Sequence, residues 1–157
     1  ITNSKKLVNN TIGVPNNIFK KINDLKNEPN MVLAMYSSGK YKGVDDLIKA
    51  FKIAKKKNPK LNFNLFGKEK KPRWIPDWIT YNYKLKEKDL VVLMNMSGIF
   101  VSSSIIEGFG LPAAEASLCG CAIATTDSGG NRDYAIHNKT ALVSKVNDPK
   151  TLASNIL

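Results

Sequence analysis

The chain has 157 residues, of which 43% are hydrophobic, and this composition fits one packed domain and excludes wholesale disorder. Its longest apolar runs, such as residues 90–94, are far shorter than the ~20 residues that a membrane-spanning helix needs. The net charge of +11 comes almost wholly from lysine, since Arg73 and Arg132 are the only arginines. Because nucleic-acid-binding proteins favour arginine, we expect a solvated lysine-rich surface and no nucleic acid partner.

Short apolar stretches that are typical of strands alternate with helical patterns along the chain. In chain order we expect a strand at 31–36, a helix at 43–57, strands at 61–66 and 78–81, a helix at 86–94, a strand at 98–102, a helix at 111–119, strands at 121–125 and 140–144, and a helix at 149–157. This alternation predicts an α/β fold, with a doubly wound parallel sheet in a single Rossmann-like domain.

In such a sheet, ligands bind beyond the carboxyl ends of the strands, at the point where the strand order reverses. With six strands in the common order, this point lies between the first and fourth strands. The loops that follow these two strands are residues 37–43 and 102–111, and both contain glycines. The sequence therefore places the candidate site between these two loops.

The loop after the fourth strand carries the pattern most typical of a binding site. Gly108 and Gly110 let the backbone approach a ligand, and the following helix would direct its free N–H groups and positive dipole end at a phosphate. Glu107 stands before this turn and Glu115 about one turn into the helix, so we expect both to face the same crevice. Because a diphosphate repels carboxylates, we expect the two glutamates to accept hydrogen bonds from sugar hydroxyl groups.

The same letters also fit the dinucleotide-binding pattern G-x-G-x-x-A, with Asp127 at about the distance expected of a ribose-binding acid. That pattern usually follows the first strand of its unit, whereas here it follows the fourth. Pro112 also stands where the helix must pack closely against the cofactor. An NAD(P)-binding dehydrogenase domain is therefore the first alternative, and a basic nucleic-acid-binding module is the second.

Lys42 lies in the loop after the first strand, directly before Gly43 and the start of a helix. A lysine there would face the same crevice and, with helix N–H groups, stabilise the charge of a leaving diphosphate. No Asp-x-Asp pair occurs in the chain, so we expect neither a metal ion nor another cofactor. A third loop, residues 127–131, is predicted either to form part of the pocket rim or to be a plain Gly-Gly turn.

Two other groups of residues invite a functional reading. Cys119 and Cys121 have no cysteine or histidine partners with metal-ligand spacing, so we expect both to be buried, unpaired and inert. Trp74 and Trp78 stand in a long basic loop. We expect this loop to fold over the edge of the domain, and contact with a nucleotide base is the second interpretation.

Motifs in a fixed order run through most of the chain. They are residues 14–19 (VPNNIF), 42–43 (KG), 46–51 (DLIKAF), 107–115 (EGFGLPAAE), 119–120 (CG), 126–130 (TDSGG), 140–143 (TALV) and 148–149 (DP). In this order they resemble the retaining GT-B glycosyltransferases of the "glycosyl transferases group 1" class. The two glutamates of the fourth motif, separated by seven residues, are its most specific part.

The resemblance implies transfer of a sugar from a nucleotide-diphosphate donor to an acceptor. It implies that Glu107 contacts the donor sugar and Glu115 the ribose hydroxyls. It assigns the donor diphosphate to Lys42, Gly108, Phe109, Gly110 and Leu111. It also implies that residues 1–20 lead in from a missing N-terminal acceptor-binding domain, and that residues 21–157 form the nucleotide-sugar-binding half, which is inactive alone.

The chain departs from the family pattern at Asn17 of the lead-in motif and at two places that bear on the site. Ser37 stands where the family often has an arginine, so one positive partner of the diphosphate is in question. The base-binding loop should lie near residues 66–71 or 81–85, which match nothing closely. We expect a cytoplasmic protein, and its basic surface is compatible with peripheral contact at the inner face of a membrane.

Overall fold

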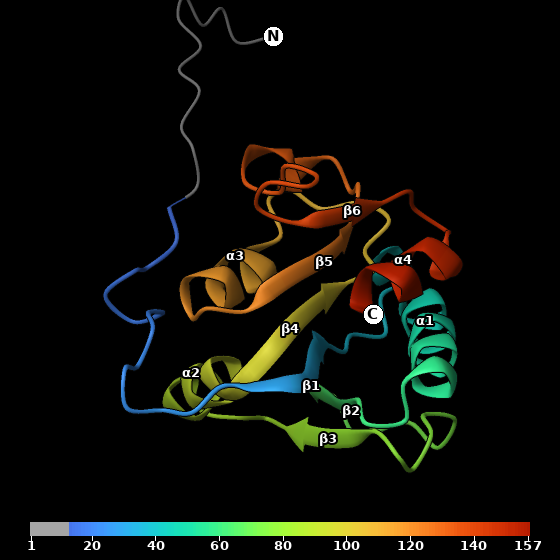
Figure 1. Ribbon diagram of the computed structural model, residues 1–157, viewed down its shortest axis with the longest axis horizontal. Helices are drawn as coiled ribbons and strands as arrows, with labels where there is room; N and C mark the ends of the chain where they lie inside the picture. The colour runs from blue at the N-terminus through green and yellow to red at the C-terminus, as the bar shows by residue number, and fades with distance from the viewer. Residues whose placement is uncertain (1–12) are drawn as a thin grey trace, which may run out of the picture.

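The computed structural model describes residues 13–157, which form a six-stranded parallel sheet with helices on both faces (Figure 1). The strands are β1 (Glu28–Met35), β2 (Asn62–Gly67), β3 (Thr80–Tyr83), β4 (Ser97–Ser102), β5 (Ala122–Thr126) and β6 (Leu142–Ser144). The helices are α1 (Val44–Lys57), α2 (Glu87–Met96), α3 (Leu111–Leu118) and α4 (Pro149–Ile156), with 3₁₀ turns η1 (Lys40–Lys42) and η2 (Gly130–Asp133). The predicted α/β fold is confirmed, while residues 1–12 of the lead-in predicted for residues 1–20 lie outside the described residues.

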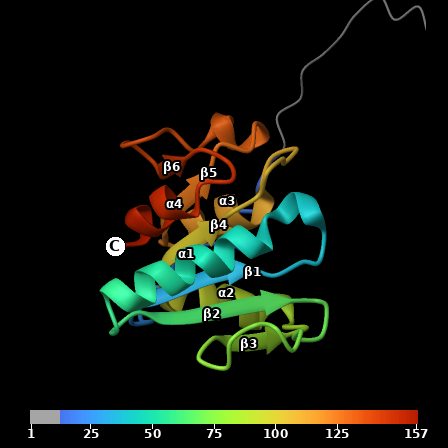
Figure 2. The ribbon, with the colours of Figure 1, turned by 90° about the vertical axis from the view of Figure 1, so that its right-hand side faces the viewer.

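Helices α1 and α4 cover one face of the sheet, and α2 and α3 cover the other (Figures 1 and 2). Successive residues of β1 serve the two cores in turn, since Val32 and Ala34 pack on the α1 side and Leu33 on the α2 side. A strand covered on both faces has to be apolar at every position. This requirement explains the continuous apolar run from which the strand was predicted.

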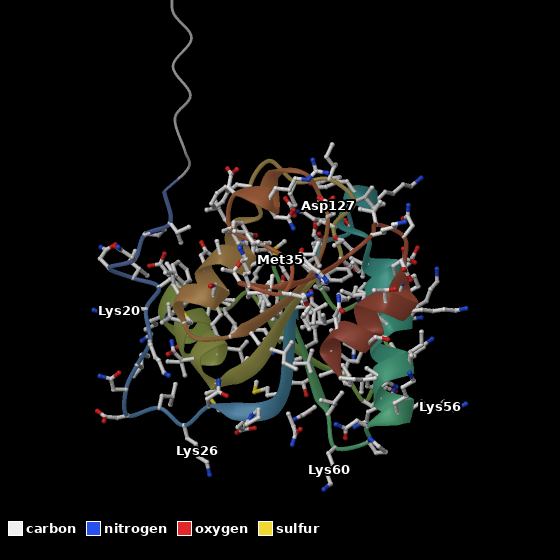
Figure 3. All side chains as sticks on the ribbon, turned by 45° about the horizontal axis from the view of Figure 1, so that its top comes forward. Lys20, Lys26, Met35, Lys56, Lys60 and Asp127 are labelled. Atoms are coloured by element: carbon white, nitrogen blue, oxygen red, sulfur yellow. The ribbon has the colours of Figure 1, made fainter. Side chains whose placement is uncertain are left out.

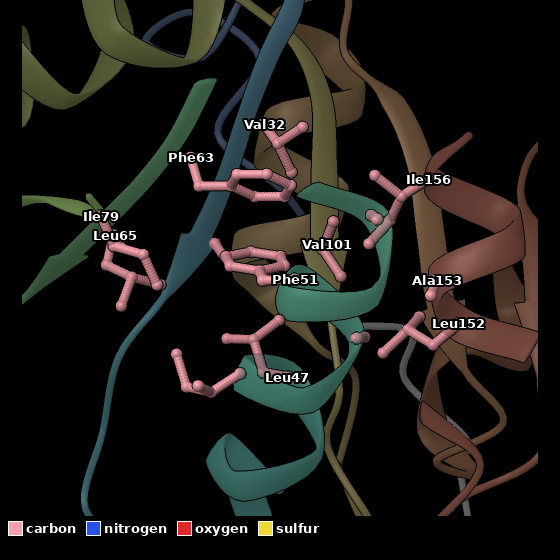
Figure 4. Packing of buried hydrophobic residues seen from close by; sticks show 14 of the residues in the cluster. Val32, Leu47, Phe51, Phe63, Leu65, Ile79, Val101, Leu152, Ala153 and Ile156 are labelled. Atoms are coloured by element: carbon pink, nitrogen blue, oxygen red, sulfur yellow. The ribbon is translucent and has the colours of Figure 1, made fainter. Parts of the chain in front are cut away.

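The core between α1 and the sheet is built largely from large side chains (Figure 4). The rings of Phe51 on α1 and Phe63 on β2 lie 4.4 Å apart between centroids, and both side chains are fully buried. Leu47, one helical turn before Phe51, packs in the same cluster. Burying each such side chain stabilises the fold by about 1.5–3 kcal/mol, so this face fixes where α1 begins relative to β1.

The connection from β2 to β3 contains no helix. Ile75 and Ile79 of this loop are buried in the α1-side core, where they fill the place of a crossover helix. Lys71 Nζ donates to the carbonyl oxygens of Pro76 and Ile79, at 3.2 and 3.1 Å. The prediction that this loop folds over the domain edge is confirmed, but the strand predicted at 78–81 begins later, at Thr80, because Ile79 is still part of the loop's core packing.

The segment before β1 packs against α2 through Phe19 and Asn95. Phe19 is 5% exposed and belongs to the core on the α2 side. The Asn95 side chain accepts a hydrogen bond from the backbone N–H of Ile22 at 2.7 Å and donates one to the carbonyl oxygen of Lys20 at 3.0 Å. Residues 19–22 are therefore held by the domain itself, and a boundary at residue 20 stays a prediction.

Cys119 and Cys121 are buried free thiols, as predicted. The Cys121 thiol donates to the carbonyl oxygens of Met94 and Ser97, at 3.1 and 3.3 Å. Burial raises the pKa of Cys119 to about 11 and that of Cys121 to about 12. Both thiols therefore stay protonated at neutral pH and act as packing residues.

The lysines that carry the net charge extend into solvent. Figure 3 shows Lys20, Lys26, Lys56 and Lys60 at the periphery, and all four are exposed. Within residues 13–157, no helix has both the length and the apolar character needed to cross a membrane.

Candidate functional site

The strand order β3-β2-β1-β4-β5-β6 reverses between β1 and β4, as the sequence predicted. The loop after β1 turns toward α1 and the loop after β4 toward α3, so they separate above the carboxyl ends of these strands. Between them lies a cavity of about 20 Å³, roughly the space of one water molecule. It is lined by Met35, Lys42, Phe100, Val101, Ser102, Ser103, Ser104, Glu107, Gly110, Pro112 and Ala113.

Lys42 and Glu107 meet across this cavity. Lys42 Nζ donates to Glu107 Oε1 at 2.7 Å, and each side chain is only 15% exposed. The Ser104 hydroxyl donates to the same carboxylate oxygen at 2.8 Å. The structure thus brings together two predicted site residues from loops far apart in the sequence, and it adds Ser104, which the sequence gave no signal to single out.

Backbone contacts between the two loops hold Lys42 in place. The Ser103 hydroxyl donates to the carbonyl oxygen of Lys42 at 2.9 Å, and the Ile105 N–H donates to that of Tyr41 at 2.7 Å. Gly43 has a φ of 61° and caps α1, and a Cβ atom there would lie 2.1 Å from the carbonyl oxygen of Ser103. Glycine is therefore required directly after Lys42, both for the turn and for the close approach of the loops.

The start of α3 offers free hydrogen-bond donors. Gly110 caps the helix with a φ of 83° and no side-chain cap. Within the described part of the chain, the backbone N–H groups of Gly108, Phe109, Gly110 and Leu111 have no hydrogen-bond acceptor. Free N–H groups at the positive end of a helix dipole form an anion site, so this tip has the chemistry predicted for diphosphate binding.

The loop 127–131 supports the start of α3 through backbone contacts with the glycine-rich segment. The Glu107 N–H donates to the carbonyl oxygen of Ser128 at 3.0 Å, and the Gly130 N–H donates back to that of Glu107 at 3.2 Å. A Cβ atom on Gly130 would lie 2.1 Å from the carbonyl oxygen of Gly108. The loop is thus neither part of the wall of the small cavity nor a plain turn, because its Gly-Gly pair permits close backbone contact with the glycine-rich segment.

Two side chains after the Gly-Gly pair extend this support, and together with the loop 127–131 they form what we call the brace. Sequence reasoning named the loop that contains Asn131 but missed Tyr134. The Tyr134 hydroxyl donates to the carbonyl oxygen of Gly110 at 2.8 Å, and its ring lies 5.2 Å from that of Phe109. The buried Asn131 side chain donates to Thr126 O and accepts from Ser128 N–H. These contacts fix the backbone from which Glu107 and the helix tip project.

Glu115 lies on α3 outside the small cavity that Glu107 lines. Burial, and then the nearby charge of Glu87 on α2, raise the pKa of Glu115. The sequence placed both glutamates in one crevice, whereas only Glu107 lines the small cavity. The contact of Glu115 with the ribose stays a prediction, and it needs a ligand that extends along α3 beyond this cavity.

A second, mostly apolar cavity of about 380 Å³ adjoins the first at Met35. Its walls come from the loops after β1, β2 and β3 and from α2, and comprise Met35, Tyr36, Ser37, Phe66, Gly67, Lys68, Glu69, Lys84, Leu85 and Leu90. Glu69 Oε1 accepts the Ser38 N–H at 3.0 Å and so ties two of these loops together. The cavity lies at the two stretches, 66–71 and 81–85, where the sequence predicted the base-binding loop.

The sequence of this chain matches a known protein family over most of its length. The family described as "Glycosyl transferases group 1" matches residues 15–157. The chain belongs to this family. It is 32% identical to an uncharacterized glycosyltransferase, YqgM, of Bacillus subtilis (strain 168), over 70% of this chain and 34% of that protein. It thus spans about a third of the length of the curated relative that it matches.

Solved structures show the same fold at low sequence identity. The C-terminal domain of the Francisella tularensis group 1 glycosyl transferase LpcC matches with a TM-score of 0.73 and 20% identity, over 90% of this chain and 85% of that one. Sucrose-phosphate synthase from Thermosynechococcus elongatus matches with a TM-score of 0.76 and 23% identity, over 90% and 40%. Anabaena HepE, solved with UDP-glucose, matches with a TM-score of 0.73 and 17% identity, over 92% and 45%.

These matches confirm the resemblance stated from the motifs and identify the fold as that of the C-terminal domain of a GT-B glycosyltransferase. They also decide against the dehydrogenase alternative, as does the position of the glycine-rich segment after β4. Asp127, the ribose-binding acid of that alternative, instead forms an ion pair with Arg132 at 2.8 Å on the surface.

Proposed function

We propose that this chain holds the nucleotide-diphosphate sugar donor of a retaining glycosyltransferase. In this proposal Lys42 and the N–H groups of residues 108–111 bind the diphosphate, Glu107 binds the donor sugar and Glu115 the ribose. The carrying observation is the 2.7 Å contact between Lys42 and Glu107 beside the free N–H groups of the α3 tip. The positive charge of Lys42 suits a diphosphate, and the carboxylate of Glu107 suits the hydroxyl groups of a sugar attached to it.

The chemistry follows from the charge that develops on the donor. When the bond between the sugar and the diphosphate breaks, negative charge builds up on the leaving oxygen. Lys42 and the helix tip offer fixed positive charge and N–H donors at that position, so the leaving group is stabilised without a metal ion in this proposal. Glu107 accepts hydrogen bonds from sugar hydroxyls and so orients the ring.

The nucleoside would extend from the tip of α3 toward α2. Two observations support this path. The charge of Glu87, at the start of α2, helps to raise the pKa of Glu115. The apolar cavity is lined by Leu90 of α2 and by Met35, which also lines the first cavity. In the proposal, the ribose hydroxyls donate to Glu115 and the base occupies the apolar cavity. Lys68 and Lys84, which line that cavity, offer positive charge where the family's arginine is replaced by Ser37.

The acceptor would be bound by another domain. The chain spans about a third of its curated relative, and in a GT-B fold the reaction takes place between two domains. We therefore expect this chain to bind the donor and to transfer no sugar on its own.

The test is calorimetric titration of the chain with UDP, GDP, ADP and dTDP. At least one should bind, and Lys42→Ala should weaken it at least tenfold, because the main positive charge at the diphosphate is lost. Lys40→Ala is the matched control, since Lys40 lies in the same 3₁₀ turn but does not line the Lys42 cavity. Binding of NAD with no response to any diphosphate would overturn the proposal, as would salt-dependent binding of DNA that Glu107→Ala leaves unchanged.

A further inference from the structure

A hollow larger than the two cavities described above shares no lining residue with the Lys42–Glu107 cavity. Its volume is about 500 Å³, within the ~300–1,000 Å³ range of small-molecule sites. The walls come from the loop after β1, the first turns of α1, the β2–β3 loop and the segment before α4. The residues are Tyr36, Ser37, Ser38, Gly39, Lys40, Gly43, Val44, Asp45, Asp46, Lys49, Trp74, Ile105 and Asn147.

One wall of this hollow is aromatic. The rings of Tyr36 and Trp74 lie 6.4 Å apart in a tilted pair, and Trp74 is 52% exposed although it is a large apolar residue. Trp74 therefore leaves much of its surface open to a ligand. The electron-rich face of an aromatic ring packs well against the C–H faces of a pyranose, which carry slight positive charge.

The charged groups of the hollow cancel each other. Two lysines, Lys40 and Lys49, stand against two aspartates, Asp45 and Asp46. Lys49 and Asp46 pair with each other at 2.9 Å, whereas Asp45 forms no ion pair with any of residues 13–157. A phosphate or carboxylate ligand would meet the aspartates, and a cationic ligand would meet the lysines. A neutral polyol suits both, since its hydroxyls donate to carboxylates and accept from ammonium groups.

We propose that this hollow is a saccharide-binding site outside the Lys42–Glu107 cavity, next to the apolar cavity with which it shares Tyr36 and Ser37, with Trp74 as its stacking platform and Asp45 and Asn147 as hydrogen-bonding groups. The protein then has two carbohydrate subsites with different lining residues. If the proposed function holds, another domain binds the reacting end of the acceptor, and this subsite binds a further sugar unit of the same glycan. Saccharide binding itself does not depend on that function, because Lys42 and Glu107 do not line the hollow.

The loop that carries Trp74 supplies its own control. Trp78 is 39% exposed in the same loop, but it packs edge-on against Phe63 and does not line the hollow. Trp74→Ala and Trp78→Ala thus remove the same side chain from inside and outside the proposed site. Asp45→Asn, a surface change on α1, tests the polar side of the site without loss of an aromatic ring.

The experiment is saturation-transfer NMR on the whole chain with maltose, cellobiose and N-acetylglucosamine at millimolar concentration. The proposal predicts a signal for at least one sugar, lost in Trp74→Ala, weakened at least threefold in Asp45→Asn and retained in Trp78→Ala and Lys42→Ala. It is overturned if no sugar gives a signal, if the two tryptophan variants behave alike, or if uridine competes for the same signal. Nucleoside diphosphate binding, measured on the same variants, should survive Trp74→Ala, and so a failure of the donor proposal is seen separately.

Discussion

Lys42 and Glu107 neutralise each other at the point where the strand order reverses. Their 2.7 Å contact leaves a cavity of only about 20 Å³, so the pair itself fills the space between the two loops. In the proposed complex the lysine turns to the diphosphate and the glutamate to the sugar. The internal ion pair therefore competes with the donor, and both halves of the donor are needed to replace it fully.

This competition predicts an unusual effect of Glu107→Gln. Removing the carboxylate charge frees Lys42, so a nucleoside diphosphate without a sugar should bind up to about fivefold more tightly, as expected for loss of a partly buried ion pair of up to about 1 kcal/mol. The preference for the sugar nucleotide over the diphosphate should fall, because the sugar loses its acceptor.

Calorimetry with matched pairs of diphosphate and diphosphate sugar measures both quantities. Asp45→Asn removes one negative charge outside the cavity and serves as the control for net charge. Weaker diphosphate binding in Glu107→Gln would contradict the competition.

Glu115 is expected to lower stability at neutral pH. Burial raises its pKa above the ordinary 4.5, so the folded state binds the proton more tightly than the unfolded state does. The charged form therefore destabilises the fold, and this penalty develops as the pH rises from the unfolded to the folded pKa. Glu115→Gln should raise Tm by a few degrees at pH 7 and have little effect on Tm below pH 4.5.

The same Glu115→Gln variant should bind nucleoside diphosphates several-fold more weakly, because an amide is a poorer acceptor for ribose hydroxyls than a carboxylate. Thermal melts at the two pH values and one titration test the two roles together. A variant that is more stable and binds as well as the parent would remove Glu115 from the site.

The two neighbouring glycines of the brace should respond very differently to alanine. A Cβ on Gly130 would lie 2.1 Å from the carbonyl oxygen of Gly108, so Gly130→Ala must move the donor-binding segment. Gly129 has a φ of 89° but nothing within 4 Å of a Cβ position, so Gly129→Ala adds only backbone strain of about 1–3 kcal/mol. We expect Gly130→Ala to lose diphosphate affinity more than tenfold, and Gly129→Ala to lower Tm with affinity nearly unchanged. Equal affinities in the two variants would argue against the brace.

Tyr134→Phe tests the brace with a smaller structural change. The change removes one hydrogen bond to the carbonyl oxygen of Gly110, which still accepts from the Ala113 N–H, and it keeps the ring beside Phe109. A net loss of about 0.5–1.5 kcal/mol is expected from such a bond. If the lost hydrogen bond serves mainly to orient the start of α3, diphosphate affinity drops about two- to tenfold while Tm changes little. Unchanged affinity with a lower Tm would make Tyr134 a stabilising residue only.

Local sequence patterns were enough to predict the helices and strands whose buried residues recur at regular spacing. The apolar run of β1 and the helical spacing of α1 predicted the sheet, and parallel topology then located the crevice that Lys42 and Glu107 line. The start of β3 was predicted too early, because Ile79 reads as a strand residue but packs as part of a loop.

The rest of the site depends on contacts between distant residues, which periodicity does not report. Tyr134 reaches Gly110 only because η2 folds back over the start of α3, and Gly129-Gly130 was the sole local signal of that contact. Spacing along the chain also did not reveal that Glu115 lies outside the cavity that Glu107 lines. The apolar cavity combines loops from three strands, and those after β2 and β3 carry no motif of their own.

The most direct test of the account is a crystal structure of the chain with the nucleoside diphosphate that binds most tightly. The account predicts that Lys42 Nζ lies within hydrogen-bond distance of a diphosphate oxygen, that the diphosphate accepts from the N–H groups of residues 108–111, and that the 2.7 Å contact with Glu107 is broken. A nucleotide bound with the Lys42–Glu107 pair intact and its diphosphate away from the α3 tip would contradict it.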